Sequence, residues 1–322
     1  LPGGEQSYNM PFLLKAPHTL HIERVQNTLN MLVERHESLR TSFDMVGDEL
    51  VQRIHSSANV EVMRERVCEG GLDKLMSKLV KPFDLHQVPL LRAGVFEYQG
   101  DHLLFIDMHH IISDGQSIEI FIREFIELYK HNQPLPPLAL QYKDYAVWEK
   151  QHEMDADVSY WEQQFKGDIP VLTLPFDEKQ TSGTKPEGGF YIRTLNQEIT
   201  NQLKKYALQQ NQTLFSLLLG MYQLLLSKYT GQKDLVVGTP SAGRNHAIFD
   251  KTVGMFVKTL PIRTHLPSAQ PVNEFFSKVQ EHCFAAFECD VDPVEWIMNR
   301  TSMTRKTNGT PLIQTMFSFH HE

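Results

Sequence analysis

The sequence has no long apolar run, and this absence sets the first limit on what the chain can be. None of its hydrophobic stretches approaches the roughly 20 residues that cross a bilayer as a helix. With 322 residues, of which 41% are hydrophobic and 22% charged, the composition is that of a soluble globular protein. A chain of this length exceeds one ordinary hydrophobic core, so we expect two lobes or one large domain.

Basic clusters and paired cysteines are missing as well. The formal net charge is -8 and the Lys and Arg residues form no block, so the phosphate contacts of nucleic-acid binding are not expected. Cys68, Cys283 and Cys289 have neither CxxC spacing nor an accompanying zinc-type set of histidines, which predicts free thiols in a reducing compartment. The chain opens without Met or a signal segment, and we expect a fragment of a longer cytoplasmic polypeptide.

Several catalytic signatures are absent too. The sequence contains no G-x-S-x-G nucleophile elbow and no glycine-rich phosphate loop of the P-loop or dinucleotide type. Hydrolase, kinase and dehydrogenase interpretations therefore lose their best support. No repeat of fixed period and no low-complexity tract occurs, so a solenoid or extensive disorder is not expected.

What the sequence does contain is a mixed order of apolar patterns, which predicts an α/β or α+β fold in two lobes. An aromatic segment that ends at Phe165 is followed by residues 181–189, which are rich in Gly, Pro, Ser and Thr. We place the boundary near residue 165, giving an N-terminal lobe of 1–165 and a C-terminal lobe of 166–322. The elements expected in the first lobe are a helix at 20–34, a hairpin with strands at 91–97 and 103–108, and a helix capped by Ser117 and ended by Pro134. Those expected in the second are helices at 199–206, 214–225 and 272–287 and strands at 235–239, 253–266 and 313–319.

The run His109-His110-Ile111-Ile112-Ser113-Asp114-Gly115 lies between the predicted hairpin and helix. Histidine exchanges protons near neutrality because its unperturbed pKa is about 6.5. Neighbouring side chains of a strand point to opposite faces, so both rings can enter one cleft only if the strand has ended. We therefore expect one histidine to react and the other to pack.

The residues alone leave the role of this run open. Asp114 could orient an imidazole ring or pair with a cation that holds the loop shut, and spacing favours neither. An ordinary turn with surface histidines fits as well as an active loop. A metal site formed by His109, His110 and Asp114 is disfavoured, since no further ligand group lies at a recognisable spacing.

Two further charged features have a plain interpretation when taken alone. Arg35 to Phe43 follows the first predicted helix and indicates a solvated cluster of charges. Arg244 follows the predicted strand at 235–239, where it could be exposed in a turn or could reach a carboxylate at another strand end. Position does not decide between these two.

Taken in order over nearly the whole chain, these runs resemble the condensation domains of nonribosomal peptide synthetases. His109 to Gly115 completes the family's His-His-x-x-x-Asp-Gly motif, and Arg35 to Phe43 matches its Arg-His-Glu-x-Leu-Arg-Thr-x-Phe motif. Lys258 stands where the family usually has asparagine, and Cys289 to Glu295 is a loose version of His-Gln-Asp-x-Pro-Phe-Glu; both departures concern contacts expected on the acceptor side. The other matching segments are Tyr8 to Pro11, Tyr142 to Trp148, Val253 to Leu260 and Pro311 to Phe317.

The resemblance implies a fold of two lobes like chloramphenicol acetyltransferase subunits, in a V-shaped pseudodimer with the histidine loop at the middle of a central tunnel. The C-terminal lobe would be incomplete, and the family's first motif would lie before residue 1. The implied reaction is amide-bond formation in antibiotic biosynthesis, with donor and acceptor held on the phosphopantetheine arms of two peptidyl carrier protein domains. The domain would bind no cofactor of its own, and an adenylation domain would be its neighbour.

The resemblance also implies roles for individual residues. His110 would hydrogen-bond the attacking amine and remove its proton, while His109 and Asp114 would be structural, with Asp114 paired to Arg244. Gly115 would form the backbone turn and Arg40 would give structural support. The runs look most like the branch that joins an L-donor to an L-acceptor. An epimerization domain, which shares the histidine run, and a non-catalytic recruiting domain of the same fold are the alternatives, whereas a cyclisation domain would carry aspartates instead of the two histidines.

Overall fold

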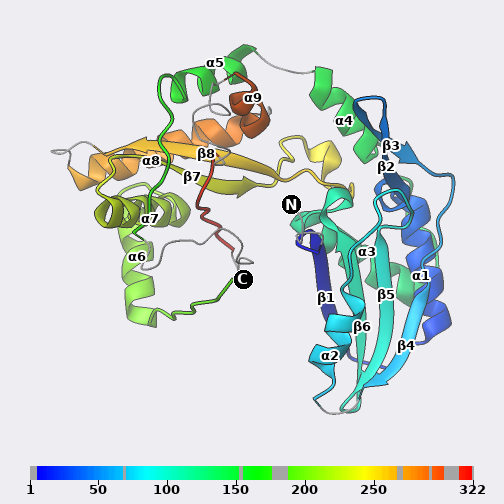
Figure 1. The fold of residues 1–322 in the computed structure, drawn as a ribbon. Coiled ribbons are helices and arrows are strands. Elements are labelled where there is room, and N and C mark those ends of the chain that lie inside the picture. Colours follow the sequence, from blue (N-terminus) through cyan, green and yellow to red (C-terminus); the bar gives the residue numbers. More distant parts are fainter. Residues whose placement is uncertain are drawn as a thin grey trace. The chain divides into compact units, whose positions relative to one another are not determined.

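Figure 1 shows the computed structural model, which describes residues 6–67, 70–151, 155–175, 188–266, 271–289, 292–300 and 312–320. The chain forms two compact units. The first unit contains Leu1–Gln151 and Arg244–Val257, and the second contains His152–Gly243 and Lys258–Glu322. The chain thus leaves the first unit and later returns to it for one segment, which we call the 244–257 segment.

This division differs from the expected boundary at residue 165 in two places. Trp161 and Phe165 are buried in the core of the second unit, so residues 152–165 belong there. The 244–257 segment belongs to the first unit, whose core includes Val253. A composition pattern along the chain cannot show such a return, because it results from contacts between distant residues.

The first unit is built on a four-stranded sheet in the order β1-β6-β5-β4, visible in Figure 1. The predicted hairpin is confirmed, since β5 and β6 pair antiparallel from Leu91 opposite Met108 to Tyr98 opposite Asp101. β1 also pairs antiparallel with β6, while β4 and β5 are parallel. A separate hairpin consists of β2 and β3. The strands are β1 Asn9–Ala16, β2 Thr41–Val46, β3 Glu49–Ile54, β4 Val62–Val67, β5 Leu91–Tyr98 and β6 Asp101–His109.

Helices cover this sheet by burying apolar stripes. The predicted first helix is present, and its residues Val25, Leu29 and Leu32 are buried in one core with Ile106 and Met108 of β6. The alternate β6 residue Phe105 packs instead with α2, as the two-residue period of a strand requires. The helices of this unit are α1 Ile22–Arg35, α2 Leu72–Leu79, α3 Gly115–His131 and α4 Tyr142–Gln151, with short 3₁₀ helices η1 Glu37–Arg40, η2 His110–Ile112 and η3 Ala247–Phe249.

The start of α3 corrects one prediction. Ser117 does not cap the helix; the N-cap is Asp114, whose Oδ1 accepts a hydrogen bond from the Ser117 backbone N–H at 2.7 Å. A carboxylate at this position satisfies one of the free amide groups of the first turn. The helix ends at His131, and its C-cap, Asn132, takes the left-handed conformation with φ 51°, before Pro134.

The second unit contains a two-stranded antiparallel sheet, β7 Asp234–Ser241 and β8 Lys258–His265. Its predicted helices are all present, and α7 packs against α8 so closely that a Cβ on Gly220 would lie 2.6 Å from the Phe276 ring. Trp161, Leu217, Val237 and Ile262 are among the buried residues of this core. The helices are α5 Asp155–Gln164, α6 Gln197–Gln209, α7 Leu214–Thr230, α8 Val272–Glu288 and α9 Pro293–Arg300.

Two predicted strands are wrong in extent. The strand expected at 253–266 begins only at Lys258, because the N–H groups of Gly254 and Phe256 bond to side chains of the first unit. Of the strand expected at 313–319, the described part forms only an isolated parallel bridge between Met316 and Gly238. Pro311 and most of the stretch 181–189, which is rich in Gly, Pro, Ser and Thr, lie outside the described residues.

Two of the three cysteines lie within the described residues. Cys283 and Cys289 are both buried, and Cys283 is a free thiol, as predicted. Burial raises the pKa of the Cys283 thiol to about 12. Cys68 lies outside the described residues. Within the part of the chain that the structure describes, no helix has the length and apolar character that a membrane crossing needs.

Candidate active site

The histidine loop begins where β6 ends and reaches the first turn of α3. His109 is the last residue of the strand and His110 the first of η2. Their backbone amides remain bonded to neighbouring segments, from His109 to the Leu90 carbonyl at 3.1 Å and from His110 to the Tyr8 carbonyl at 2.7 Å. The strand thus ends between the two histidines, which releases their side chains from strict alternation.

The ring of His109 is held on several sides. Its Nδ1 accepts a hydrogen bond from the Ile111 backbone N–H at 3.1 Å, so the neutral ring carries its proton on Nε2. The rings of Tyr8 and Phe83 each lie 6.0 Å from it, centroid to centroid. Desolvation lowers the pKa of His109, and the neighbouring His110 lowers it further. These contacts favour a neutral, fixed imidazole.

His110 differs in its surroundings. Its ring is half-buried, and the Nδ1 atom is buried with no hydrogen-bond partner among the described residues. Buried polar atoms are usually paired, and an exception calls for a reason. Within the described part of this loop, His110 therefore offers a ring nitrogen that the protein itself does not use.

Both carboxylate oxygens of Asp114 accept hydrogen bonds that hold the loop in place. Besides capping α3 through Oδ1, it accepts the Phe256 backbone N–H on Oδ2 at 2.8 Å. Arg244 Nη2 lies 3.4 Å from Oδ1, and both side chains are almost completely buried. Of the two roles left open by the sequence, pairing with a cation is the one the structure has, and the predicted partner is Arg244.

Arg244 bonds to other residues of the 244–257 segment and also to the first turn of α3. Its Nη1 donates to the carbonyls of Phe249 and Thr252 at 2.7 and 2.8 Å, and its guanidinium carbon lies 3.8 Å from the centroid of the Phe256 ring. Burial lowers the pKa of Arg244, and Asp114 opposes that shift. The guanidinium nevertheless stays protonated, since its pKa is far above neutrality.

Ser117 is a residue whose role the sequence did not indicate. Its hydroxyl donates to the Gly254 carbonyl at 2.8 Å and accepts from the Gly254 N–H at 3.1 Å and from Arg244 Nη2 at 2.9 Å. A hydroxyl has one proton and two lone pairs, and all three are used here. Ser117 and Asp114 together hold the 244–257 segment to the start of α3.

Gly115 is the first residue of α3, and its backbone does not need a glycine. Its φ lies outside the left-handed range, and a Cβ built on it would meet no atom within 4 Å. The structure therefore gives no conformational reason for the predicted turn role of Gly115. What the glycine provides is open space beside the histidine loop.

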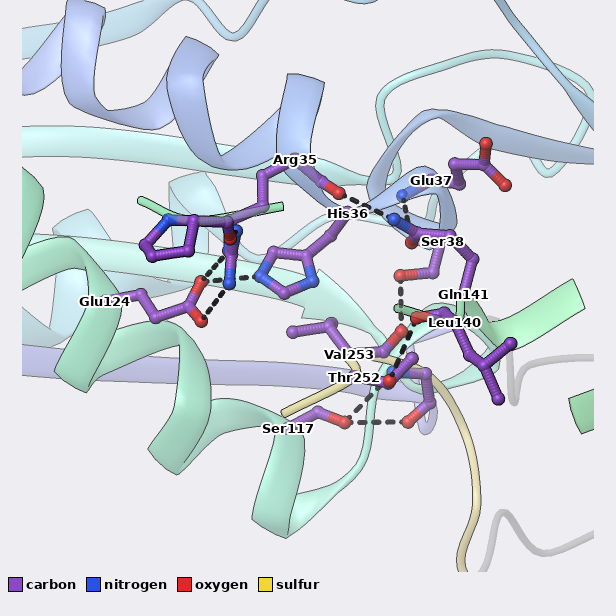
Figure 2. A network of polar contacts seen from close by, with 12 residues as sticks. Arg35, His36, Glu37, Ser38, Ser117, Glu124, Leu140, Gln141, Thr252 and Val253 are labelled. Atoms are coloured by element: carbon purple, nitrogen blue, oxygen red, sulfur yellow. Dashed lines mark hydrogen bonds and ion pairs between the residues drawn. The ribbon is translucent and has the colours of Figure 1, made fainter. Parts of the chain in front are cut away.

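The run Arg35 to Phe43 corrects another expectation, because His36 is buried and Arg35 half-buried instead of belonging to a solvated cluster. Figure 2 shows Arg35 and His36 meeting Glu124 of α3, with Arg35 Nε and His36 Nε2 at 2.9 and 2.7 Å from Oε2. Desolvation lowers the pKa of His36, and Glu124 opposes this shift. The pKa of Glu124 is lowered as well, because hydrogen bonds from His36 and Arg35 outweigh its desolvation.

The same run reaches the 244–257 segment, as Figure 2 shows. Ser38 Oγ donates to the Val253 carbonyl at 2.8 Å. Gln141, just before α4, donates to the Arg35 carbonyl at 2.9 Å and accepts the Glu37 N–H at 3.1 Å. The run thus joins α1, α3, α4 and the 244–257 segment into one polar network.

Arg40 supports a different part of the unit. It donates to the carbonyl of His55, and its Nη2 lies 3.7 Å from Glu37 Oε1. Its Nε is buried with no hydrogen-bond partner among the described residues. These contacts hold the residue after β3 to η1, so the support that Arg40 gives is to the β2–β3 hairpin.

The segment Tyr142 to Trp148 forms much of α4 and packs aromatic rings on the 244–257 segment. The Tyr142 hydroxyl donates to the Met255 carbonyl at 2.9 Å, and burial raises the pKa of Tyr142 well above its usual value. The ring of Tyr145 lies 4.6 Å from that of Phe256. A Cβ on Gly254 would lie 2.2 Å from Tyr142 Cδ2, so this close approach requires glycine.

The site offers no cluster of metal ligands. Among the residues that the structure describes, no group of three or more His, Cys, Asp or Glu side chains is arranged to hold a metal ion. The site is thus a loop of bonded polar residues in which His110 keeps a buried ring nitrogen, Nδ1, without a hydrogen-bond partner among the described residues.

Comparison with known proteins identifies the family. The model of the condensation domain matches residues 1–321. The chain is 39% identical to bacitracin synthase 1 from Bacillus licheniformis over 99% of its own length and 6% of that protein. It is 38% identical to tyrocidine synthase 3 from Brevibacillus parabrevis over 98% of its length and 5% of that protein. The chain thus spans a small fraction of the synthetases it matches.

Solved structures show the same fold. The SgcC5 protein from Streptomyces globisporus matches with a TM-score of 0.79 and 25% identity, over 98% of this chain and 74% of that one. The X-domain from teicoplanin biosynthesis matches with a TM-score of 0.83 and 23% identity, over 96% of this chain and 72% of that one.

The mixed α/β architecture is that of the chloramphenicol acetyltransferase-like fold. More specifically, the chain belongs to the condensation-domain family of nonribosomal peptide synthetases. This family forms amide bonds and works with substrates held on carrier-bound phosphopantetheine. The predicted family, fold class and enzyme class are thereby confirmed.

Proposed function

We propose that this domain joins a donor aminoacyl or peptidyl thioester to the amino group of an acceptor aminoacyl thioester, each carried on the phosphopantetheine arm of a carrier protein domain. One observation carries the proposal: in a loop whose other polar side chains are bonded, His110 keeps a buried Nδ1 with no partner among the described residues. That nitrogen is not tied to the frame of the loop, so the half-buried ring of His110 is left to be oriented by a substrate amine.

The chemistry asks little of the protein beyond placement and a proton acceptor. The acceptor nitrogen attacks the donor carbonyl carbon, a C–N bond forms, and the C–S bond of the thioester breaks. A proton leaves the amine for His110 and returns to the departing sulfur. Such acid–base help is worth about 10² to 10⁴ in rate, and alignment of the two tethered reactants contributes several kcal/mol more.

The remaining site residues act on His110 and the loop. His109, kept neutral by burial, adds no second positive charge beside the reacting ring. Asp114 and Arg244 fix the start of α3, and Arg40 supports the β2–β3 hairpin. Gly115 leaves space beside the loop, which fits a role in admitting a substrate arm.

We further propose the branch that joins an L-donor to an L-acceptor, with peptidyl carrier and adenylation domains as partners in a cytoplasmic synthetase. The small share of each related synthetase that the chain spans supports such a multidomain setting. The phosphopantetheine would come from the carriers and not from this domain. The implied product is a peptide of the antibiotic type, since the related proteins are named for bacitracin and tyrocidine.

The test is mass analysis of products after mixing the domain with one donor-loaded and one acceptor-loaded carrier. The proposal predicts a new peptide, one residue longer than the donor chain, on the acceptor carrier. A donor with an inverted stereocentre and no peptide would establish an epimerization domain instead. If carriers bind but no covalent change occurs, the domain is a recruiting module and the proposal fails.

A further inference from the structure

A second polar network, centred on a buried carboxylate, lies just before the histidine pair on the same strand. Asp107 of β6 is completely buried and stands directly opposite Arg92 of β5. Because side chains of a strand alternate, Asp107 shares its face of the sheet with His109. Its Oδ2 accepts from Asn9 Nδ2 at 2.8 Å and from Arg92 Nη1 at 3.2 Å.

Arg92 connects this carboxylate to the segment that precedes β5. Its Nη1 donates to the Lys81 carbonyl and its Nη2 to the Pro82 carbonyl, both at 2.6 Å. Asn9 Nδ2 donates to the same Lys81 carbonyl at 2.9 Å. The guanidinium carbon lies 3.7 Å from the centroid of the Phe83 ring. Arg92 thus fixes both the backbone and the aromatic ring of this segment.

Phe83 in turn meets the imidazole of His109, edge to face, at 6.0 Å between centroids. His109 Nδ1 then holds the Ile111 N–H in the first turn of η2, the turn to which His110 belongs. A continuous chain of contacts therefore leads from Asp107 and Arg92 to the backbone of the reactive histidine.

A purely stabilising role explains this network poorly. Burying a carboxylate such as that of Asp107 costs several kcal/mol, and the Arg92 side chain that pairs with it remains 26% exposed. Apolar residues of similar size often do as well or better. The cost is visible in Asp107, whose pKa is raised by desolvation despite the hydrogen bonds from Asn9 and Arg92. What such a pair does supply is fixed geometry, since the planar fork of arginine binds several acceptors at once.

We propose that Asp107 and Arg92 are positioning residues for amide formation: they hold Phe83 against the ring of His109, and His109 holds the turn that presents His110. The inference rests on the proposed function for its effect on rate. Its structural half, the control of the His109 environment by Arg92 through Phe83, stands independently and has its own readout.

The test uses Arg92→Gln and Phe83→Leu, with Arg66→Gln as the matched control. Arg66 is a mostly exposed arginine on the same sheet, with Nε 3.7 Å from Glu97. Two quantities are measured: kcat and KM for peptide formation with loaded carriers, and the titration of His109 followed by NMR of nitrogen-15-labelled histidine. For Arg92→Gln and Phe83→Leu we expect kcat to fall by about 10- to 100-fold, as small misplacements of reacting groups do, with KM unchanged.

In both variants the pKa of His109 should also rise toward its ordinary value, because the ring loses part of its burial. Arg66→Gln should change neither quantity. A fall in kcat with an unmoved His109 titration in both variants would overturn the proposal, and so would unchanged kcat in both. If Arg92→Gln does not fold, Phe83→Leu decides alone. If the wild-type domain forms no peptide, the proposed function fails, while the His109 titration still tests the contact chain.

Discussion

His109 and His110 are neighbours in the sequence, yet their rings differ in their hydrogen bonds and in their packing. His109 is fixed by the Ile111 N–H and by two aromatic rings, whereas the buried Nδ1 of His110 has no partner among the described residues. The sequence predicted that one histidine would pack and the other react, but only the family resemblance pointed to His110. The contacts of His109 show a packed ring, and the role of His110 stays a prediction.

The pair of Asp114 and Arg244 leads to a prediction about stability. Replacing Asp114 with Ala removes the N-cap of α3 and also removes the carboxylate that pairs with the buried guanidinium of Arg244. Breaking a buried ion pair in this way costs about 3–5 kcal/mol. Urea denaturation should show this loss in the free energy of unfolding. Asp101→Ala is the control, because Asp101 forms an exposed ion pair with Lys15. A loss for Asp114→Ala as small as that of the control would contradict the account.

His36 leads to a prediction about pH. Burial lowers its pKa in the folded chain, so below about pH 6.5, the unperturbed value, the unfolded chain takes up a proton that the folded one does not. The stabilisation is fully present above that pH and is lost as pH falls from there toward the folded pKa. His36→Gln, which can still donate to Glu124, should flatten the curve of unfolding free energy between pH 5 and about 7.

The comparison with His36→Gln is needed because other histidines titrate in the same region. The pKa of His109 is also lowered by burial, whereas that of His86 is raised by its hydrogen bond to Asp44. These groups are common to both proteins, so the difference between the two curves isolates His36. Parallel curves for the wild type and the variant would show that His36 is not the group responsible.

At the scale of elements, the sequence predicted those whose pattern is set by a single buried face. The helices α1, α3, α7 and α8 and the β5–β6 hairpin carry regular apolar periods, and they form close to where expected. The segment at 253–257 has the apolar content of a strand but not the structure, because Asp114 and Ser117 take its N–H groups. No local pattern shows that a side chain more than a hundred residues away will compete for a backbone donor.

The buried polar network around Arg35 was missed for a related reason. Charged residues in sequence suggest solvent, and His36 is buried only because Glu124, on another helix, accepts from it. The same holds for Arg92 and Asp107, which alternate normally in their strands and carry no motif. Such residues become visible only when the partners are placed in space.

Substituting Ala for two glycines of the site should lower the free energy of unfolding at one position and leave it nearly unchanged at the other. Gly254→Ala forces a methyl group against Tyr142, and overpacking of this kind costs about 1–3 kcal/mol. Gly115→Ala adds a methyl group in open space, so the free energy of unfolding should change by no more than about 0.5 kcal/mol. Thermal or urea unfolding of both variants measures the contrast, and equal losses in the two would contradict the packing described.

The Gly115→Ala variant also tests what the open space is for. If the space admits a substrate arm, peptide formation with loaded carriers should slow in a protein of unchanged stability. Normal rates would show that the space beside the histidine loop is not used by the substrates.

At the scale of the whole molecule, the chain matches a small part of each synthetase that it resembles. Its family follows from a match along residues 1–321 and from relatives 38% and 39% identical over almost its full length. The fold is shared with structures whose identity is lower, so the architecture survives extensive sequence change. Within the first unit, the 244–257 segment ties the helix that follows the histidine loop to α4 through Asp114, Ser117 and Tyr142.

The most direct test of the account is the single-turnover rate of peptide formation in His110→Ala, with donor and acceptor carriers loaded and the domain in excess. His102→Ala is the matched control, since His102 is a histidine on the same strand whose Nδ1 is likewise buried without a partner among the described residues. The account predicts a fall of about 10² to 10⁴ in rate for His110→Ala, with unfolding unchanged and the control near the wild type. A His110→Ala domain that forms peptide at nearly the wild-type rate would contradict it.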